Sequence, residues 1–478
     1  MAFLKLAVEK FEFDEKTDNV RELYEKVKGE YSCLLESGGG YEEGVDGSRY
    51  SYFVYDPFLV AWAKAGIDQM IRRRDFCGFL KSGAGQIVEG EPGRMITDLL
   101  EKFVYKGKGP VPFCGGAVGY FGYDFGCGMM DVSQKVYDYL NIPDFWFGFY
   151  DKVVAIDHKE KVIYLMGVSD TEMSAERTVE QIKKDLSGPA PLRRKGEAGE
   201  MKSNLSKDVY VEKVAEIKGL LKEGEAYQVN FSQRFSAECN MDGFGVYRRL
   251  AEINPAPFAC YFDHPDFKIV SCSPVLLLRK RGSVVESWPI KGTVRRGGEN
   301  DDDEAFKELL ASEKDEAELS MIVDLVRNDL GKVSEPGSVE VVGHRELLKC
   351  SHVLHTFSRV RGKLRVGADI YDCIKALFPG GSITGCPKKR SMEIIDRFED
   401  FKRGVYTGSA GFISFNGESD FNILIRTMIL KDGMVYFNSG GGIVIDSSPE
   451  SEYQEVYDKA EALLKTVAKS ESGYRFGG

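Results

Sequence analysis

The sequence predicts a fold of mixed α/β (α+β) class with large antiparallel sheets. Segments of helical periodicity alternate with strand-like segments, and turns such as Asn416-Gly417 and Asp432-Gly433 join neighbouring strands into hairpins. Of the 478 residues, 43% are hydrophobic and 12% aromatic, which is enough apolar surface to form a core. At roughly 100–200 residues per domain, the chain holds several domains or one large interleaved fold.

The composition also limits the class of protein. A net charge of −11 disfavours a general nucleic-acid binder, but it leaves room for a local cationic pocket that binds a small anion. The ten cysteines are dispersed and form no C-x-x-C pair, which is typical of a reducing cytosol and predicts a cytoplasmic protein. Acidic residues follow directly after the first short apolar stretch, so we expect no signal peptide. The sequence contains no apolar run of about 18 residues, so we expect no membrane-spanning helix.

A segment rich in Gly, Pro, Ser and charge, residues 187–206, has no apolar period and predicts a linker or exposed loop. It separates an N-terminal region, residues 1–186, from a second region, residues 207–470, which carries most of the motifs described below.

In the N-terminal region, Tyr50–Val54 alternates as a strand does, and Lys152–Asp157 and Lys161–Met166 predict a hairpin. Gly115–Asp124 combines glycine with aromatic residues and is typical of a tight turn between packed strands.

In the second region, Ser206–Gly224 predicts a helix capped by Ser206 and ended by Gly224. Its expected apolar face comprises Val209, Val214, Ile217, Leu220 and Leu221. Asp301–Leu330 predicts one long helix, and Ser448-Pro449 opens a last helix. Strands are expected at Phe412–Phe415, Phe421–Leu430 and Val435–Phe437.

Two of these helices carry carboxylates that can bind a cation. Glu318 shares a helix face with Met321, Ile322 and Leu325, so it points toward the core and needs a cation or hydrogen-bond donors. On the last helix, Glu452, Glu455 and Lys459 occupy neighbouring faces. If the two helices face each other, Glu318 and Glu455 can share one Mg²⁺ with water and a substrate carboxylate. The alternative is that Glu452 to Lys459 form a solvated surface stripe.

The segment Gly380–Lys388 has the glycines of a phosphate loop but lacks the Lys that must follow the second Gly. A glycine turn that opens a helix near Pro387 favours an anion, such as a carboxylate, and the alternative is an ordinary loop. Arg426 is expected midway along an apolar strand, where it needs a carboxylate partner, and the alternative is an internal salt bridge. The glycines that follow, Gly440–Gly442, allow backbone to approach a ligand.

Two further side chains can take part in catalysis. Lys291, between Ile290 and Gly292, is either a plain surface charge or, if desolvated near other cations, a nucleophile. His355 is either a satisfied structural histidine or a catalytic group.

Taken together, these motifs resemble the chorismate-utilising enzymes. The match runs in family order over roughly residues 30–465. It comprises LLES (Leu34–Ser37), GGAVGYFGYD (Gly115–Asp124), EAYQVNFSQRF (Glu225–Phe235), PIKGT (Pro289–Thr293), ELSMIVDLVRNDLGKV (Glu318–Val333), FPGGSITGCPKKRSMEIID (Phe378–Asp396), GSAGFIS (Gly408–Ser414) and GGGIV (Gly440–Val444). The resemblance implies large antiparallel sheets packed between helices, with the active site between them.

Within the family, the chain most resembles the branch that aminates chorismate at C4 for para-aminobenzoate and folate synthesis. Gln228 stands where isochorismate and salicylate synthases carry a Lys that activates water, and Lys291 stands where anthranilate synthases usually have Ala. The resemblance implies that Lys291 attacks C2 and expels the C4 hydroxyl, and that ammonia then displaces the lysine. The alternatives are anthranilate formation on the same scaffold and a pseudoenzyme that binds tryptophan or a partner without turnover.

The resemblance also implies a role for individual residues. Glu318 and Glu455 would hold Mg²⁺, with Glu452 in support. The substrate would be bound by Arg426, Thr384, Gln228, Gly440, Gly441 and Gly442, and His355 and Thr293 would act beside Lys291. Ser37, Asn254 and Pro255 match a pocket that binds tryptophan in related enzymes.

One departure from the family affects the chemistry, because Val275 replaces the usual Glu of a Ser-Pro-Glu motif that is linked to proton transfer. We also find no stretch of about 190 residues for a glutaminase domain, so a separate glutamine amidotransferase subunit is expected to supply ammonia.

Overall fold

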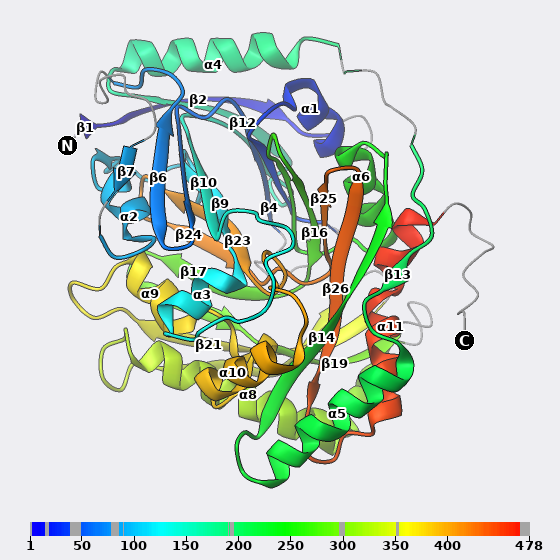
Figure 1. The fold of residues 1–478 in the computed structure, drawn as a ribbon. Coiled ribbons are helices and arrows are strands. Elements are labelled where there is room, and N and C mark those ends of the chain that lie inside the picture. Colours follow the sequence, from blue (N-terminus) through cyan, green and yellow to red (C-terminus); the bar gives the residue numbers. More distant parts are fainter. Residues whose placement is uncertain are drawn as a thin grey trace.

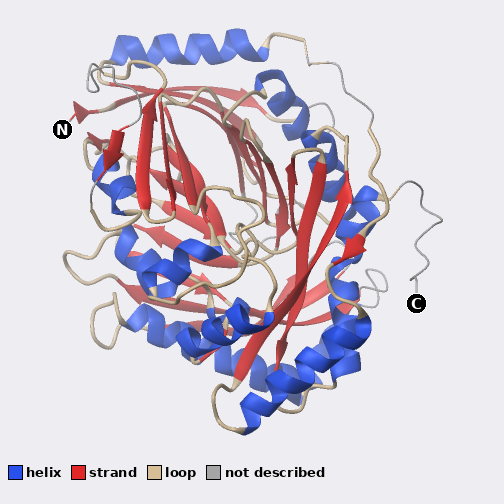
Figure 2. Ribbon diagram, viewed as in Figure 1, coloured by secondary structure: helices blue, strands red, loops and turns tan. Residues whose placement is uncertain are grey.

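The fold is described from a computed structural model. It describes residues 2–14, 19–38, 49–77, 86–88, 90–189, 191, 196–295, 302–349 and 353–468. Helices lie along the outside of the molecule and most strands lie inside (Figure 2). The predicted mixed α/β class with large antiparallel sheets between helices is confirmed.

Two 12-stranded antiparallel sheets form the centre of the molecule (Figure 1). The first sheet has the spatial order β19 (Ile290–Arg295), β21 (Val353–Lys363), β18 (Val284–Trp288), β17 (Leu276–Arg281), β24 (Ser419–Asn422), β23 (Ser409–Ser414), β9 (Gly116–Phe121), β10 (Phe145–Tyr150), β5 (Leu59–Lys64), β6 (Ile67–Arg72) and β7 (Gln86–Val88), and β20 (Glu340–Lys349) pairs with β21.

The second sheet has the order β13 (Lys202–Ser203), β14 (Gln228–Glu238), β26 (Met434–Ile443), β25 (Thr427–Lys431), β16 (Lys268–Ser273), β15 (Phe258–Asp263), β3 (Ser32–Glu36), β4 (Tyr50–Val54), β11 (Lys152–Asp157), β12 (Val162–Ser169) and β2 (Lys5–Glu12), and β22 (Gly385–Cys386) pairs with β14. A small parallel pair joins β1 (Ala2–Phe3) to β8 (Phe103–Val104). Each large sheet mixes strands from before and after residues 187–206, so the sheets do not divide at that segment.

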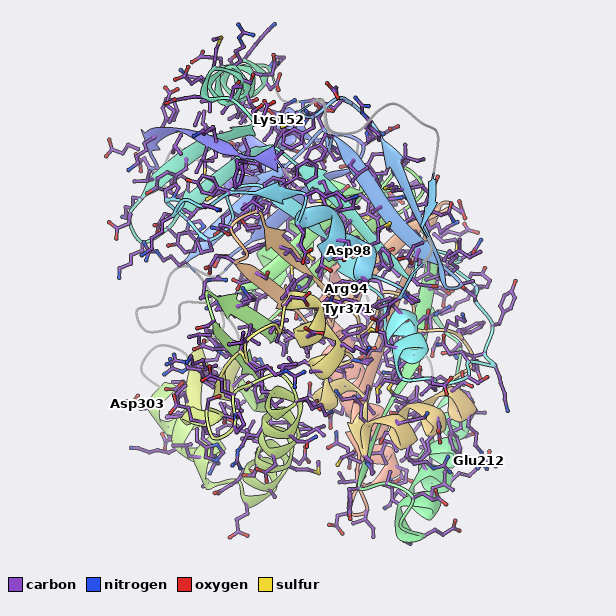
Figure 3. The ribbon with its side chains drawn as sticks, turned by 90° about the vertical axis from the view of Figure 1, so that its left-hand side faces the viewer. Arg94, Asp98, Lys152, Glu212, Asp303 and Tyr371 are labelled. Carbon is purple, nitrogen blue, oxygen red and sulfur yellow. The ribbon has the colours of Figure 1, made fainter. Side chains whose placement is uncertain are left out.

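Three large apolar cores and a small fourth one around Trp288 hold these layers together in the described part of the chain. One lies between the sheets and joins Tyr52 and Val153 of the second sheet to Val118 and Trp146 of the first. The outer face of the first sheet packs against α2 (Arg94–Leu100), α3 (Tyr123–Met129), α8 (Glu313–Gly331), α9 (Ile370–Leu377) and α10 (Lys388–Phe398). On that side, the Arg94 guanidinium of α2 lies 5.4 Å from the Tyr371 ring of α9 (Figure 3).

The outer face of the second sheet packs against α1 (Val20–Val27), α4 (Glu172–Leu186), α5 (Lys207–Lys222), α6 (Gly243–Ile253) and α11 (Pro449–Val467). The expected helix after Ser206 is confirmed, but Tyr210 is buried in place of Val209, which is exposed. The last helix also begins as expected, with Pro449 in its first turn.

Three predicted elements are wrong in detail. The long helix breaks into α7 (Asp302–Ala311) and α8, because the Ser312 side chain accepts a hydrogen bond from the Asp315 amide and caps the second helix. Gly115–Asp124 is no turn between strands but the central strand β9 followed by the start of α3. Glycine suits this strand, because a Cβ at Gly119 would lie 2.0 Å from the Trp146 carbonyl oxygen.

The third correction concerns Phe421–Leu430, which is two strands in different sheets. β24 ends at Asn422 in the first sheet, and β25 begins at Thr427 in the second. The crossing is fixed by backbone hydrogen bonds from Ile423 to Val275 and from Leu424 to Gly408. Arg426 therefore does not lie midway along a strand but at the end of this crossing, in the left-handed conformation with φ +51°.

Candidate active site

Lys291 and Glu318 face each other across the first wall of the site, which is formed by β19, β21 and α8. The Lys291 amine donates a hydrogen bond to Glu318 Oε2 at 2.6 Å, and the two side chains are only 19% and 16% exposed. The Lys291 carbonyl oxygen accepts a hydrogen bond from Thr356 at 2.6 Å. The cation that Glu318 requires on its inward face is therefore Lys291, and Lys291 is not a plain surface charge.

His355 is buried on the neighbouring strand, and its Nδ1 lies 3.1 Å from the Gly292 carbonyl oxygen. A carbonyl oxygen accepts, so Nδ1 carries the proton and Nε2 is the acceptor nitrogen. Burial, together with the positive charges of Arg426 and Lys459, lowers the pKa of His355 to about 3. His355 is therefore a neutral imidazole near neutral pH, suited to accept a hydrogen bond rather than to supply a proton as an imidazolium.

Acidic side chains of the last helix gather over glycine at the second wall, formed by β26 and α11. A Cβ at Gly441 would lie 3.0 Å from Glu452 Oε2 and 3.3 Å from Glu455 Oε1, so a side chain at this position would crowd both carboxylates. Glu455 pairs with Lys459 at 2.5 Å, and Lys459 also donates to the Gly440 carbonyl oxygen at 3.2 Å.

Glu452 is buried at this wall and accepts a hydrogen bond from Ser447 at 2.6 Å. The interpretation of this helix face as a fully solvated stripe is therefore wrong for Glu452. Lys459, which is expected on this face without a role, lies close enough to His355 for its charge to lower the pKa of that histidine.

Gln228 and Thr384 lie where β14 meets the glycines of β26. Gln228 is fully buried, and neither its amide oxygen nor its amide nitrogen has a hydrogen-bond partner within the described part of the chain. A Cβ at Gly442 would lie 2.8 Å from the Gln228 Nε2. A buried amide of this kind is available to a ligand. Thr384 is also buried, but its hydroxyl donates to the Gly380 carbonyl oxygen at 2.9 Å.

The Gly380–Lys388 turn opens α10 as expected, and buried ion pairs that sequence reasoning missed hold it in place. Lys388 donates to Asp329 of α8 at 2.7 Å. Arg403 is buried, pairs with Glu399 at 2.7 Å and donates to the Ile383 carbonyl oxygen at 2.9 Å. No local signal marks Arg403, because an i,i+4 pair with Glu399 is also typical of an exposed surface.

Arg426 contacts the turn that follows α6. Its Nη1 donates to Asn254 Oδ1 at 2.9 Å, which links the predicted substrate arginine to the Asn254-Pro255 motif. Ser37, which is predicted to share a tryptophan-type pocket with this motif, is buried, and the next residue, Gly38, donates to the Ala256 carbonyl oxygen at 2.9 Å. The segments that carry Ser37 and Pro255 therefore lie side by side.

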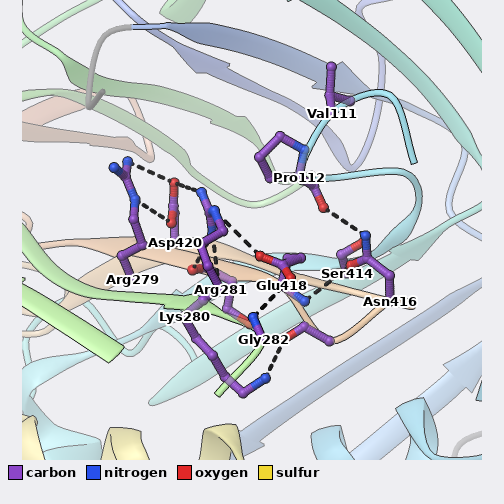
Figure 4. Close-up of polar contacts among 12 residues, drawn as sticks. Val111, Pro112, Arg279, Lys280, Arg281, Gly282, Ser414, Asn416, Glu418 and Asp420 are labelled. Carbon is purple, nitrogen blue, oxygen red and sulfur yellow. Dashed lines mark hydrogen bonds and ion pairs between the residues drawn. The ribbon is translucent and has the colours of Figure 1, made fainter. Parts of the chain in front are cut away.

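A cavity between the two sheets lies beside these segments. Its lining includes Glu36, Pro257 and Phe258, next to the predicted residues, together with Tyr52, Arg279 and Asp420. Asp420 accepts hydrogen bonds from Arg279 at 3.0 and 3.1 Å and from Arg281 at 2.8 Å (Figure 4). Two arginines lower the pKa of Asp420, so this wall of the cavity is charged at neutral pH.

Two further predicted positions, Thr293 and Val275, contribute no described polar side chain to the site. The backbone of Thr293 pairs with that of His355, but the Thr293 side chain lies outside the described residues. Val275 is buried in the apolar core beside the first sheet, so no acid replaces the missing Glu at that position.

The donor set at the second wall fits Mg²⁺ chemistry. Mg²⁺ commonly takes one or two carboxylates and completes its octahedron with water and substrate oxygens. Glu452 and Glu455 meet over Gly441, whereas Glu318 is paired with Lys291. Within the described ranges, no group of three or more His, Cys, Asp or Glu side chains is arranged to hold a metal by itself.

No helix in the described part of the chain has the length and apolarity needed to cross a membrane.

Comparison with known proteins supports the family resemblance. The profile of the chorismate binding enzyme family matches residues 88–465. Anthranilate synthase component 1 of Acetivibrio thermocellus is 38% identical over 462 residues, covering 92% of this chain and 91% of that protein. Aminodeoxychorismate synthase component 1 of Bacillus subtilis (strain 168) is 36% identical over 466 residues, covering 95% and 96%.

A solved structure agrees with these sequences. The crystal structure of anthranilate synthase component I from Streptococcus pneumoniae TIGR4 matches with a TM-score of 0.78 and 30% identity, covering 90% of this chain and 94% of that chain. The predicted membership is confirmed, and the chain belongs to the chorismate binding enzyme family, whose members use chorismate.

Proposed function

We propose that this chain aminates chorismate at C4 and yields 4-amino-4-deoxychorismate. The observation that carries the proposal is a primary amine, Lys291, withdrawn from solvent beside Glu318 and His355. A lysine in such a place can act as a nucleophile once it has lost its proton.

In the proposed reaction, the Lys291 nitrogen forms a bond to C2 of chorismate as the C4 hydroxyl leaves with its bonding electrons. Ammonia then forms a bond to C4, and the bond between Lys291 and C2 breaks, so the net change is ammonia consumed and water released. Before attack, the Lys291 amine must leave Glu318 and give up a proton. His355, with Nε2 as its acceptor nitrogen, can accept a hydrogen bond from the hydroxyl region of the substrate.

We assign carboxylate binding to Arg426 and to the second wall. Arg426 would bind the enolpyruvyl carboxylate, and Gln228 and the Gly440–Gly442 backbone would lie against the ring. Glu318, Glu452 and Glu455 would hold Mg²⁺, which would neutralise the ring carboxylate.

Ammonia would come from a separate glutaminase subunit. Both similar proteins are named as a component 1, which supports a second component for this chain. The cavity beside Glu36 and Pro257 would take tryptophan, since it adjoins the Ser37 and Asn254-Pro255 motifs.

Anthranilate formation is the second candidate, because relatives with that name are as similar as the aminodeoxychorismate synthase. Mass spectrometry of the products from chorismate, Mg²⁺ and ammonium separates the two. We expect 4-amino-4-deoxychorismate, which releases para-aminobenzoate only when a lyase is added. Fluorescent anthranilate would contradict the proposal, and unchanged chorismate would favour a pseudoenzyme.

A further inference from the structure

We propose that Asn254 is a positioning residue that holds the Arg426 guanidinium in the orientation required to bind a substrate carboxylate. The inference deepens the proposed function, since it rests on the assignment of chorismate binding to Arg426. It assigns Asn254 a contact with the substrate arginine in addition to its place beside the cavity.

The backbone of Arg426 is fixed where the chain enters the second sheet. The Arg426 carbonyl oxygen accepts a hydrogen bond from the Cys272 amide at 3.2 Å. The Arg426 φ angle is +51°, which is uncommon for a residue other than glycine. A conformation of this kind persists only where the surrounding structure holds it, as the Cys272 hydrogen bond does here. The guanidinium, however, lies at the end of a long flexible side chain and needs a contact of its own to stay in one place.

Asn254 supplies that contact from the end of α6. Its backbone amide donates to the Leu250 carbonyl oxygen at 2.7 Å, and its Nδ2 donates to the Cys272 carbonyl oxygen at 3.3 Å. Because the amide nitrogen faces a carbonyl, the amide oxygen faces Arg426 and accepts its Nη1 hydrogen bond at 2.9 Å. The same amide therefore ties the Arg426 side chain to the Cys272 backbone that binds the Arg426 carbonyl.

The chemistry of this partner is neutral, which matters for substrate binding. An aspartate in the same place would form a charge-assisted pair with Arg426 and offset its positive charge. An asparagine accepts one hydrogen bond and adds no negative charge beside the guanidinium. The charge of Arg426 acts on other residues of the site, since it contributes to the lowered pKa of His355.

The test compares Asn254→Ala and Asn254→Asp with the wild type, in the full chain with Mg²⁺. Loss of a hydrogen bond to a charged group predicts an Asn254→Ala chorismate KM raised by about tenfold, with kcat changed less than about twofold. Asn254→Asp keeps an acceptor of the same size, and we expect an equal or larger rise in KM. Titration calorimetry with chorismate, without ammonium, should show the same changes in Kd.

A double-mutant cycle separates positioning from loss of structure. In an Arg426→Ala background, Asn254→Ala should raise KM by less than about twofold, because the guanidinium it positions is absent. Asn240→Ala, which removes an amide bonded to the Glu197 backbone, should leave KM unchanged. Full additivity of the two alanine changes, or a wild-type KM for Asn254→Asp, would overturn the proposal.

The outcome is independent of which product forms. If the wild type makes anthranilate, the proposed amination fails, yet the KM changes still test Asn254. If the wild type makes 4-amino-4-deoxychorismate and the cycle is additive, only the positioning role fails.

Discussion

The two walls of the site are built in different ways. In the first wall, Lys291 and Glu318 neutralise each other in a place that is about one-fifth exposed or less, and His355 is buried and neutral. In the second wall, the Glu455 and Lys459 side chains are 43% and 47% exposed and lie over glycine. A shielded amine is suited to covalent chemistry, and a buried carboxylate beside a half-exposed one is suited to a cation that keeps part of its water. In the proposed reaction the first wall supplies the nucleophile and one Mg²⁺ ligand, Glu318, whereas the second wall supplies the other two carboxylates, and substitutions can disturb each wall separately.

The largest effect is expected from removing the amine of the first wall. Lys291→Ala should lower turnover by about 10³-fold or more, because the proposed covalent step would have no nucleophile, while chorismate should still bind. Product formation is measured by mass spectrometry and chorismate binding by calorimetry. Lys363→Ala is the control, since its amine pairs with Glu335 at the surface. Wild-type turnover by Lys291→Ala would remove Lys291 from the mechanism.

A carboxylate placed at Val275 tests whether the first sheet tolerates the acid found in the family. Val275 is buried among apolar side chains, so Val275→Glu should lower the free energy of unfolding by about 3 kcal/mol near pH 8. Val275→Gln introduces a side chain of similar size that is neutral, so it should lower the free energy of unfolding by less. Denaturant unfolding measures this free energy for both variants. Equal losses of unfolding free energy in the two variants would exclude the charge of Glu as the cause of the destabilisation. A higher kcat for Glu than for Gln would show that the family's acid still has a use here.

The fold class and the family followed from the sequence because the glycine-rich motifs and alternating periods are local signals. The crossing at Arg426 did not, because most residues from Phe421 to Leu430 are apolar and no Gly or Pro marks the change of sheet. In the site, too, contacts between residues distant in sequence could not be predicted from local patterns. The inward face of Glu318 was visible from helical spacing, but its partner Lys291 is 27 residues away in sequence. Contacts of this kind depend on tertiary packing, which overrides local pattern.

A smaller effect is expected from the open wall. Glu455→Gln removes one negative charge beside Gly441, so the Mg²⁺ concentration that gives half-maximal activity should rise by about tenfold or more. Calorimetric titration with Mg²⁺ gives a second reading that does not depend on turnover. Glu461→Gln is the matched control, because Glu461 lies on the same helix and is likewise paired with the lysine four residues later, Lys465. An unchanged Mg²⁺ titration would refute a ligand role for Glu455.

The smallest effect concerns the neutral histidine of the first wall and appears as pH dependence. With a folded pKa of about 3 and an ordinary value of 6.5, the unfolded chain binds an extra proton between these values. Stability due to neutral His355 is therefore complete above about pH 6.5 and falls as the pH decreases toward 3.

Between pH 5.5 and 4.5, the wild type should lose about 1.4 kcal/mol more unfolding free energy than His355→Gln, which cannot titrate. Denaturant unfolding at the two pH values measures this difference. His264, whose pKa is also lowered by burial, to about 4, is present in both proteins and cancels in the comparison. Equal losses of unfolding free energy in the two proteins would mean that His355 is already protonated or exposed in the fold, so that it is not the neutral, buried group of the first wall.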